Sequence, residues 1–251
     1  MTHLEIYDSP DAMTGAAATL FAAQAAEAVS ARGRFTAALS GGKTPVALYT
    51  LLARPPFVSQ IPWDRVHLLW SDERSVPPDH AESNYRLVRE LLIDRVPIRA
   101  ANVFRMRGEM DPEEAAERYE ALLRDRFAAV GGGSPDLDFI LLGLGEDGHT
   151  ASLFPGTAAV RETTRWVVGH YVDDRKGWRI TLTPPAINAA RLVVFIAAGP
   201  GKAAVVRDIL QGPFQPDRLP AQAVRPAEGR PIWLLDRQAA KLLSPHGKDI
   251  L

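Results

Sequence analysis

Two residues near the middle of the chain, Asp147 and His149, have the types and the spacing for proton transfer. They lie in the stretch LGLGEDGHTASLFPG, residues 142–156. Residues two apart on an extended loop point to the same side, so the carboxylate can contact the imidazole. Such a carboxylate fixes the imidazole tautomer and stabilises its protonated form, which makes His149 a candidate general base. The structural alternative is that Asp147-Gly148 forms a simple turn and that His149 caps a short helix.

The same stretch also fits the G-x-G-x-x-G spacing of a dinucleotide-binding turn, through Gly143, Gly145 and Gly148. Asp173, further along the chain, would then be the acid that binds the ribose. That interpretation requires a long helix after the third glycine, whereas Pro155 ends any helix here after about two turns. It would also place the Asp147 carboxylate against a negatively charged pyrophosphate. The sequence therefore favours a catalytic loop over a nucleotide site.

Three further segments place backbone amides and basic side chains where an anion could bind. In SGGKTP, residues 40–45, successive amides precede a helix-like segment, an arrangement that suits a phosphate. A tight turn capped by Thr44 is the alternative. Arg74, Arg179 and Lys202 could add positive charge, and Asp72 could hold a sugar hydroxyl or a partner side chain; solvated salt bridges and surface positions are the alternatives. The candidate binding residues are Ser40, Gly41, Gly42, Lys43, Thr44, Asp72, Arg74, Arg179 and Lys202.

Strand-like and helix-like segments alternate along the chain and must position these residues. Strands are expected at 4–8, 34–40, 66–73, 137–145, 166–172, 179–183, 191–199 and 231–236, and helices at 13–31, 45–52, 83–93, 112–127, 184–190, 201–210 and 237–243. This alternation predicts an α/β fold with a mostly parallel sheet and helices on both faces. Ligands bind beyond the carboxyl ends of the strands in such folds. A strand follows the glycine-rich stretch 131–136 at once, so we expect a surface loop there and a single domain over residues 1–251.

The composition excludes several classes of function. Of the 251 residues, 46% are hydrophobic and 24% charged, and the formal net charge is -1. Such a near-neutral chain gives no indication of a nucleic acid or membrane partner. Cysteine is absent and the six histidines form no metal-binding pair, so we expect no metal, no cofactor and a cytoplasmic location. Acidic residues precede the alanine-rich segment near the N-terminus, which indicates an amphipathic helix rather than a targeting signal.

Taken together, these segments resemble the 6-phosphogluconolactonases of the glucosamine-6-phosphate isomerase/6-phosphogluconolactonase family. The motifs that carry the resemblance follow the order of that family over nearly the whole chain: SGGKTP, WSDERSVPP with ESNYRL, LGLGEDGHTASLFPG, RITLTPPAIN, GPGKA, LPAQAVRP and WLLD. LGLGEDGHTASLFPG is the most specific of them. One position departs from the pattern, because Glu82 in ESN stands where an aspartate is expected.

The resemblance implies a Rossmann-like α/β fold shared with glucosamine-6-phosphate deaminases. It implies a cofactor-independent carboxylic ester hydrolase that converts 6-phospho-D-glucono-1,5-lactone to 6-phosphogluconate in the oxidative pentose phosphate pathway. In that reaction His149, oriented by Asp147, would take a proton from the attacking water, and the basic residues with the Gly41–Thr44 amides would hold the phosphate. An amino-sugar phosphate deaminase is an alternative, although related deaminases carry a glutamate where this chain has Phe154. A sugar-phosphate-binding regulatory domain is another, but it has little need of Asp147 and His149.

Overall fold

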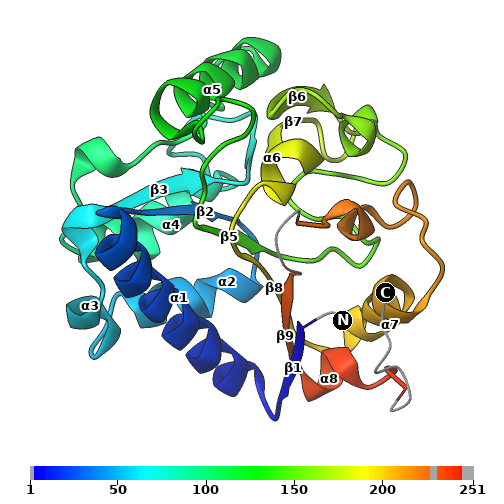
Figure 1. The fold of residues 1–251 in the computed structure, drawn as a ribbon. Helices are drawn as coiled ribbons and strands as arrows, with labels where there is room; N and C mark the ends of the chain where they lie inside the picture. The colour runs from blue at the N-terminus through cyan, green and yellow to red at the C-terminus, as the bar shows by residue number, and fades with distance from the viewer. Residues whose placement is uncertain (1–2, 227–230, 245–251) are drawn as a thin grey trace.

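The computed structural model describes residues 3–226 and 231–244 (Figure 1). Its main sheet has six parallel strands. Their order is β1 (His3–Tyr7), β9 (Ile232–Asp236), β8 (Val193–Ala197), β5 (Phe139–Leu142), β2 (Phe35–Leu39) and β3 (Val66–Trp70). Every residue of β2, β5 and β8 is buried, as expected for central strands covered on both faces. The predicted mostly parallel sheet is confirmed.

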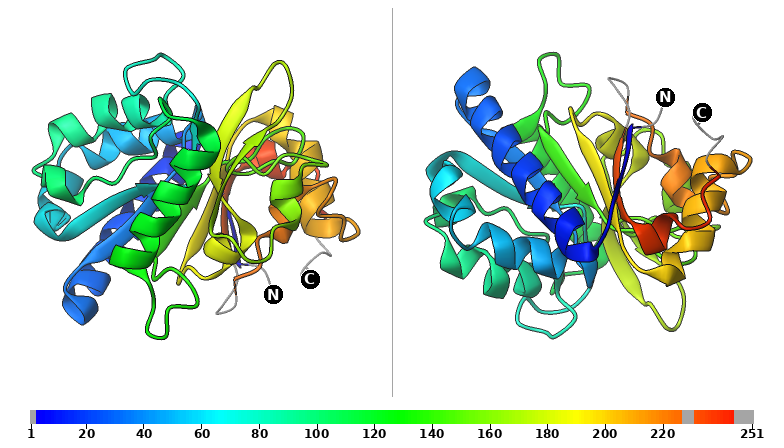
Figure 2. Two further views of the ribbon diagram at one scale, coloured as in Figure 1. Left: turned by 90° about the horizontal axis from the view of Figure 1, so that it is seen from above. Right: turned by 90° about the horizontal axis from the view of Figure 1, so that it is seen from below.

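Helices cover both faces of this sheet. The helices of the described residues are α1 (Pro10–Arg32), α2 (Thr44–Leu52), α3 (Phe57–Gln60), α4 (Asn84–Leu91), α5 (Pro112–Phe127), α6 (Pro184–Asn188), α7 (Ala203–Gln211) and α8 (Arg237–Ala240). In Figure 2, α5 lies in front of the strands when seen from above and α1 lies in front when seen from below. Among the described residues, no helix has the length and apolar character that a membrane crossing requires.

The longest helix, α1, shows how local sequence sets the element boundaries. The Ser9 side chain accepts a hydrogen bond from the Ala12 amide at 3.1 Å, and Pro10 opens the first turn. At the other end, Gly33 takes a left-handed conformation with a φ of 75°, and its amide bonds to the Val29 carbonyl. The buried side of α1 is mostly alanine with Phe21, whose ring meets Phe35 and Phe139 edge to face. Small side chains therefore let α1 lie close to β2 and β9, and the Phe21 ring reaches β5 at Phe139.

A second, antiparallel sheet was not predicted. It contains β4 (Asp72–Arg74), β7 (Trp178–Leu182) and β6 (Val167–Tyr171), in that order. The prediction of one continuous strand over 66–73 is wrong, because Ser71 passes from one sheet to the other. Its amide bonds to the Leu39 carbonyl of β2, whereas its carbonyl accepts from the Leu182 amide of β7. The polar residues after β3 therefore form the strand β4 instead of a loop.

The order of the parallel strands places a crevice between β2 and β5. From β2 the chain continues to β3 on one side, and from β5 it continues to β8 on the other, by way of the second sheet. Loops that leave neighbouring strands in opposite directions open a gap at the carboxyl ends of those strands. The segments SGGKTP and LGLGEDGHT follow β2 and β5, so both border this gap.

Candidate active site

A cavity of about 370 Å³ lies where the loops after β2, β5 and β8 meet. Its wall contains every predicted site residue except Asp147 and Arg179: Ser40, Gly41, Gly42, Lys43, Thr44, Asp72, Arg74, His149 and Lys202. Residues from loops more than a hundred positions apart in the sequence therefore meet in one site. The wall also contains Asn84 and Glu146, which sequence reasoning did not select.

His149 and Asp147 form the expected pair. Nδ1 of His149 lies 2.5 Å from Oδ1 of Asp147, and the His149 amide donates to the same oxygen at 3.2 Å. Burial by itself raises the pKa of Asp147, but the hydrogen bond and charge of His149 outweigh it and bring that pKa to about 2. The carboxylate is therefore ionised at neutral pH. Among the described residues, Nε2 of His149 has no hydrogen-bond partner, so this nitrogen is free to accept a proton.

The glycine at 145 in this loop makes room for the Asp147–His149 pair. A Cβ on Gly145 would lie 2.0 Å from Nδ1 of His149 and 2.5 Å from Oδ1 of Asp147, whereas a Cβ on Gly143 would contact nothing within 4 Å. Gly148 has a φ of 83°, which only glycine adopts readily. Residues 149–157 form turns and one bridge, so neither the crossover helix of a nucleotide site nor a short helix capped by His149 is present there.

Asp173 also differs from a ribose-binding acid. It lies in the turn between β6 and β7, where its carboxylate pairs with the Lys176 ammonium at 2.8 Å. Both features that a nucleotide site requires, the crossover helix and the ribose-binding acid, are therefore missing from this loop and its surroundings.

Ser152 ties the catalytic loop to all three strands of the second sheet. Its hydroxyl donates to Oδ2 of Asp72 at 2.7 Å in β4, and its amide donates to the Thr181 hydroxyl at 3.1 Å in β7. Its carbonyl accepts from Nε2 of His170 at 2.9 Å in β6. Burial lowers the pKa of His170, this bond to the Ser152 carbonyl opposes the shift, and the charge of Arg179 adds to it. Nothing in the sequence indicates this role for Ser152, because its partners come from distant strands.

The loop after β2 has the features of an anion site. The Ser40 side chain is 3% exposed, and its hydroxyl has no partner among the described atoms. No side chain caps α2, whose N-cap residue is Lys43, so the alternative of a turn capped by Thr44 is wrong. Gly42 has a φ of 97°, and a Cβ on Gly41 would overlap Oδ1 of Asn84 at 1.8 Å. The amides at the start of α2 are therefore available to a ligand.

Asp72, Glu73 and Arg74 have three different roles. Oδ1 of Asp72 accepts from the Asn84 amide group at 3.2 Å, so its carboxylate joins the start of α4 to Ser152. Glu73 is buried and accepts from three backbone amides, those of residues 74, 84 and 85. Burial raises the pKa of Glu73, and these three bonds oppose the rise. Arg74 donates to the Glu82 carbonyl at 2.8 Å, so Glu82 acts through its main chain.

The predicted cations do not all reach the cavity. Arg179 lies opposite Arg74 in the β4–β7 register, but it is not in the cavity wall, and its guanidinium donates to the carbonyls of Lys176 and Trp178. Burial lowers the pKa of Arg179, and the like charge of Arg74 adds to this effect. Lys202 does line the cavity, at the N-cap of α7. Of these cations, the Arg74 guanidinium and Lys202 at a helix start therefore line the cavity, where they favour a bound anion.

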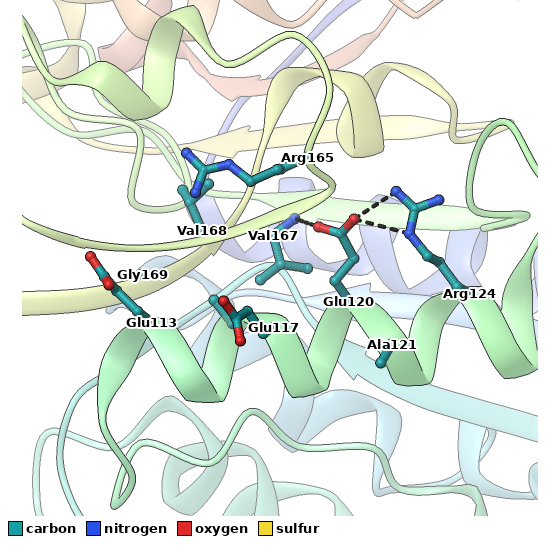
Figure 3. Close-up of a pocket in the computed structure, with 10 residues that line it drawn as sticks. Glu113, Glu117, Glu120, Ala121, Arg124, Arg165, Val167, Val168 and Gly169 are labelled. Carbon is teal, nitrogen blue, oxygen red and sulfur yellow. Dashed lines mark hydrogen bonds and ion pairs between the residues drawn. The ribbon is translucent and has the colours of Figure 1, made fainter.

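A second hollow lies between α5 and β6 and contains none of the predicted residues (Figure 3). There Oε2 of Glu120 accepts from the amides of Trp166 and Val167 and so covers the free edge of β6. Its other oxygen pairs with Arg124 at 2.6 Å. This contact pairs the free edge of β6, which gives Glu120 a structural role.

Comparisons with known proteins agree with the geometry. Residues 8–233 match the family described as glucosamine-6-phosphate isomerases/6-phosphogluconolactonase. The chain is 43% identical over 220 residues to the 6-phosphogluconolactonase of Synechocystis sp., a match that covers 87% of this chain and 89% of that protein. It is 41% identical over 249 residues to the Homo sapiens 6-phosphogluconolactonase, with coverages of 96% and 93%.

Solved structures give the same result. The 6-phosphogluconolactonase of Trypanosoma brucei superposes with a TM-score of 0.84 at 30% identity, over 97% of this chain and 99% of that one. A monomeric glucosamine-6-phosphate deaminase superposes with a TM-score of 0.82 at 21% identity, over 96% of this chain and 100% of that one. At that identity, the second likeness concerns the fold alone.

Proposed function

Because the chain belongs to the glucosamine-6-phosphate isomerase/6-phosphogluconolactonase family, we propose that His149 is the general base of a 6-phosphogluconolactonase reaction. The substrate is 6-phospho-D-glucono-1,5-lactone and the product is 6-phosphogluconate. The relatives named for this activity support lactone hydrolysis in the pentose phosphate pathway. The role of each residue is our proposal.

The observation that carries the proposal is the position of the Asp147–His149 pair. His149 lies in the cavity wall, and Asp147 holds its Nδ1 from outside that wall. Nε2 of His149 takes a proton from water while the water oxygen attacks the lactone carbonyl carbon. The ionised Asp147 stabilises the imidazolium that forms. His149 then returns the proton to the ring oxygen as the bond between that oxygen and the carbonyl carbon breaks.

The phosphate occupies the other part of the cavity, against the start of α2. The unpartnered Ser40 hydroxyl and the amides of Gly41–Thr44 supply hydrogen bonds, and Arg74 and Lys202 supply charge. Arg179 acts from beside Arg74 by adding to the positive potential. Binding energy from the phosphate thereby holds the carbonyl carbon against the water next to His149.

An assay of the purified protein separates the three candidate functions. We expect turnover of the phosphorylated lactone above an enzyme-free blank, which is necessary because such lactones also hydrolyse spontaneously, and no ammonia release from glucosamine 6-phosphate. Ammonia release with no lactone turnover would identify a deaminase instead. Binding of 6-phosphogluconate without turnover of either compound would indicate a regulatory domain.

A further inference from the structure

The His149 ring has a second neighbour besides Asp147. The phenyl ring of Phe154 stacks on it, with 4.2 Å between the ring centroids and 29° between the planes. Phe154 is 6% exposed and is not part of the cavity wall. The imidazole is therefore held at one nitrogen by a carboxylate and over one face by an aromatic ring, both from outside the cavity.

The main chain that carries the Phe154 ring is itself fixed. The Phe154 carbonyl accepts from the Thr157 amide at 3.1 Å and from the Thr157 hydroxyl at 2.8 Å. Ser152, two residues earlier, is bonded to the three strands of the second sheet. Because the loop is held on both sides of Leu153, the phenyl ring has little freedom to leave the imidazole.

Other charged groups surround this stack. Lys176 places its ammonium 5.0 Å from the centroid of the Phe154 ring, and Asp173 pairs with that ammonium at 2.8 Å. On the cavity side, the charged residues of the wall are Lys43, Asp72, Arg74, Glu146 and Lys202. Of these groups, only Asp147 is bonded to the His149 ring among the described residues, so Asp147 and the Phe154 ring are the neighbours that meet the charge developing on His149.

We propose that Phe154 is a positioning residue of the hydrolysis, which sets the plane of the His149 ring and stabilises the imidazolium formed when His149 takes a proton from water. This inference rests on the proposed role of His149 as general base. The stack keeps Nδ1 directed at Asp147, so that Nε2 is the nitrogen presented to water. The negative face of a phenyl ring also attracts a cation more strongly than a neutral ring.

The test compares Phe154→Leu, which removes the aromatic face, with Phe154→Tyr, which keeps it. We expect Phe154→Leu to lower kcat about tenfold with little change in KM, and tenfold corresponds to ~1.4 kcal/mol. The acidic limb of its kcat–pH profile should move to lower pH, because the imidazolium loses a stabilising neighbour. Phe154→Tyr should restore both quantities. Phe154→Met, which also lacks an aromatic face, replaces the leucine variant if that variant does not fold.

Phe104→Leu is the matched control. The Phe104 ring also packs against a histidine, His67, with 5.8 Å between the ring centroids, but neither residue lines the cavity. We expect it to lower the melting temperature and to keep the wild-type kcat and pH profile. Wild-type kcat and pH profile in Phe154→Leu, or equal losses in the leucine and tyrosine variants, would overturn the positioning role. His149→Ala in the same assay keeps the two claims apart, since wild-type turnover there would contradict the general base instead.

Discussion

The absence of a Cβ atom at Gly145 makes room for the Asp147–His149 pair. The imidazole of His149 and the carboxylate of Asp147 occupy the space that a side chain at residue 145 would fill. The Gly145 amide also donates to the His149 carbonyl at 2.8 Å, which closes the loop around the pair. Gly145, one of the glycines that make this segment resemble a nucleotide-binding turn, is thus required by the packing of the Asp147–His149 pair.

Gly145→Ala should therefore lower kcat strongly. The added methyl group must displace the His149 ring or the Asp147 carboxylate, and a shift of about 1 Å at a reacting group can reduce the rate roughly a hundredfold. Steady-state kinetics on the phosphorylated lactone measures this, with KM expected to change little. Gly15→Ala in α1, where a Cβ meets nothing within 4 Å, is the control and should keep the wild-type kcat. Equal kcat in Gly145→Ala and Gly15→Ala would show that Asp147 and His149 can be displaced without loss of activity.

Among the elements, we propose that the loops after β2 and β8 form the phosphate end of the cavity and that the loop after β5, with His149, forms the carbonyl end. The first supplies the start of α2 and the second supplies Lys202 at the start of α7. A lysine at a helix start is unfavourable towards the helix dipole, so its presence favours an anion bound nearby. This arrangement predicts that the substrate is bound through its phosphate, at a distance from the lactone bond that breaks.

Unphosphorylated glucono-1,5-lactone should therefore be a poor substrate. Each charge-assisted contact contributes roughly 1.5–3 kcal/mol, so losing two or three should reduce kcat/KM at least about a hundredfold, with part of the loss in kcat. Arg74→Ala and Lys202→Ala should each impair hydrolysis of the phosphorylated lactone far more than that of the plain one. Arg118→Ala on α5, whose partner is Glu114, is the control and should affect neither. Similar efficiency on both lactones would remove the phosphate-site assignment.

Local signals in the sequence predicted the strands, most helices and the loops that carry the site. SGGKTP and LGLGEDGHT could be placed because each follows an apolar strand, and parallel strands bring such loops to one edge. The contacts of Ser152 and Asn84 could not be predicted, since their partners are fixed only once two sheets have formed. The division between β3 and β4 was missed for the same reason, because Ser71 bonds to strands of both sheets.

At the scale of the whole molecule, the small sheet holds the catalytic loop against the large one. Asp72 of β4 and His170 of β6 both bond to Ser152, so the small sheet is joined at two strands to the loop that carries His149. A single domain over residues 1–251 stays a prediction, and so does a cytoplasmic location. The molecule also contains partly buried histidines whose protonation opposes folding, as His67 illustrates.

Stability should fall on mild acidification, in part because of His67. Burial lowers the pKa of His67 below its ordinary value of 6.5, and Arg34 lowers it further. A lowered histidine pKa contributes stability that is present above the unfolded pKa and is lost as pH falls below it. The melting temperature should therefore be lower at pH 5.5 than at pH 7.5, and His67→Phe should reduce this difference.

The phenylalanine variant suits the site, because Nδ1 of His67 is buried without a partner and the ring packs against Phe104 and Phe127. Its kcat should match the wild type, since His67 lies outside the cavity. If His67→Phe kept the full difference in melting temperature between pH 7.5 and pH 5.5, groups other than His67 would be responsible for that difference.

The most direct test of the whole account is the kinetics of His149→Ala, measured together with its calorimetric affinity for 6-phosphogluconate. Loss of a general base typically lowers a rate about 10²–10⁴-fold, and we expect kcat to fall within that range. The affinity should stay close to the wild-type value, because the phosphate contacts lie at the other end of the cavity. Wild-type turnover in this variant, after subtraction of the enzyme-free rate, would contradict the account.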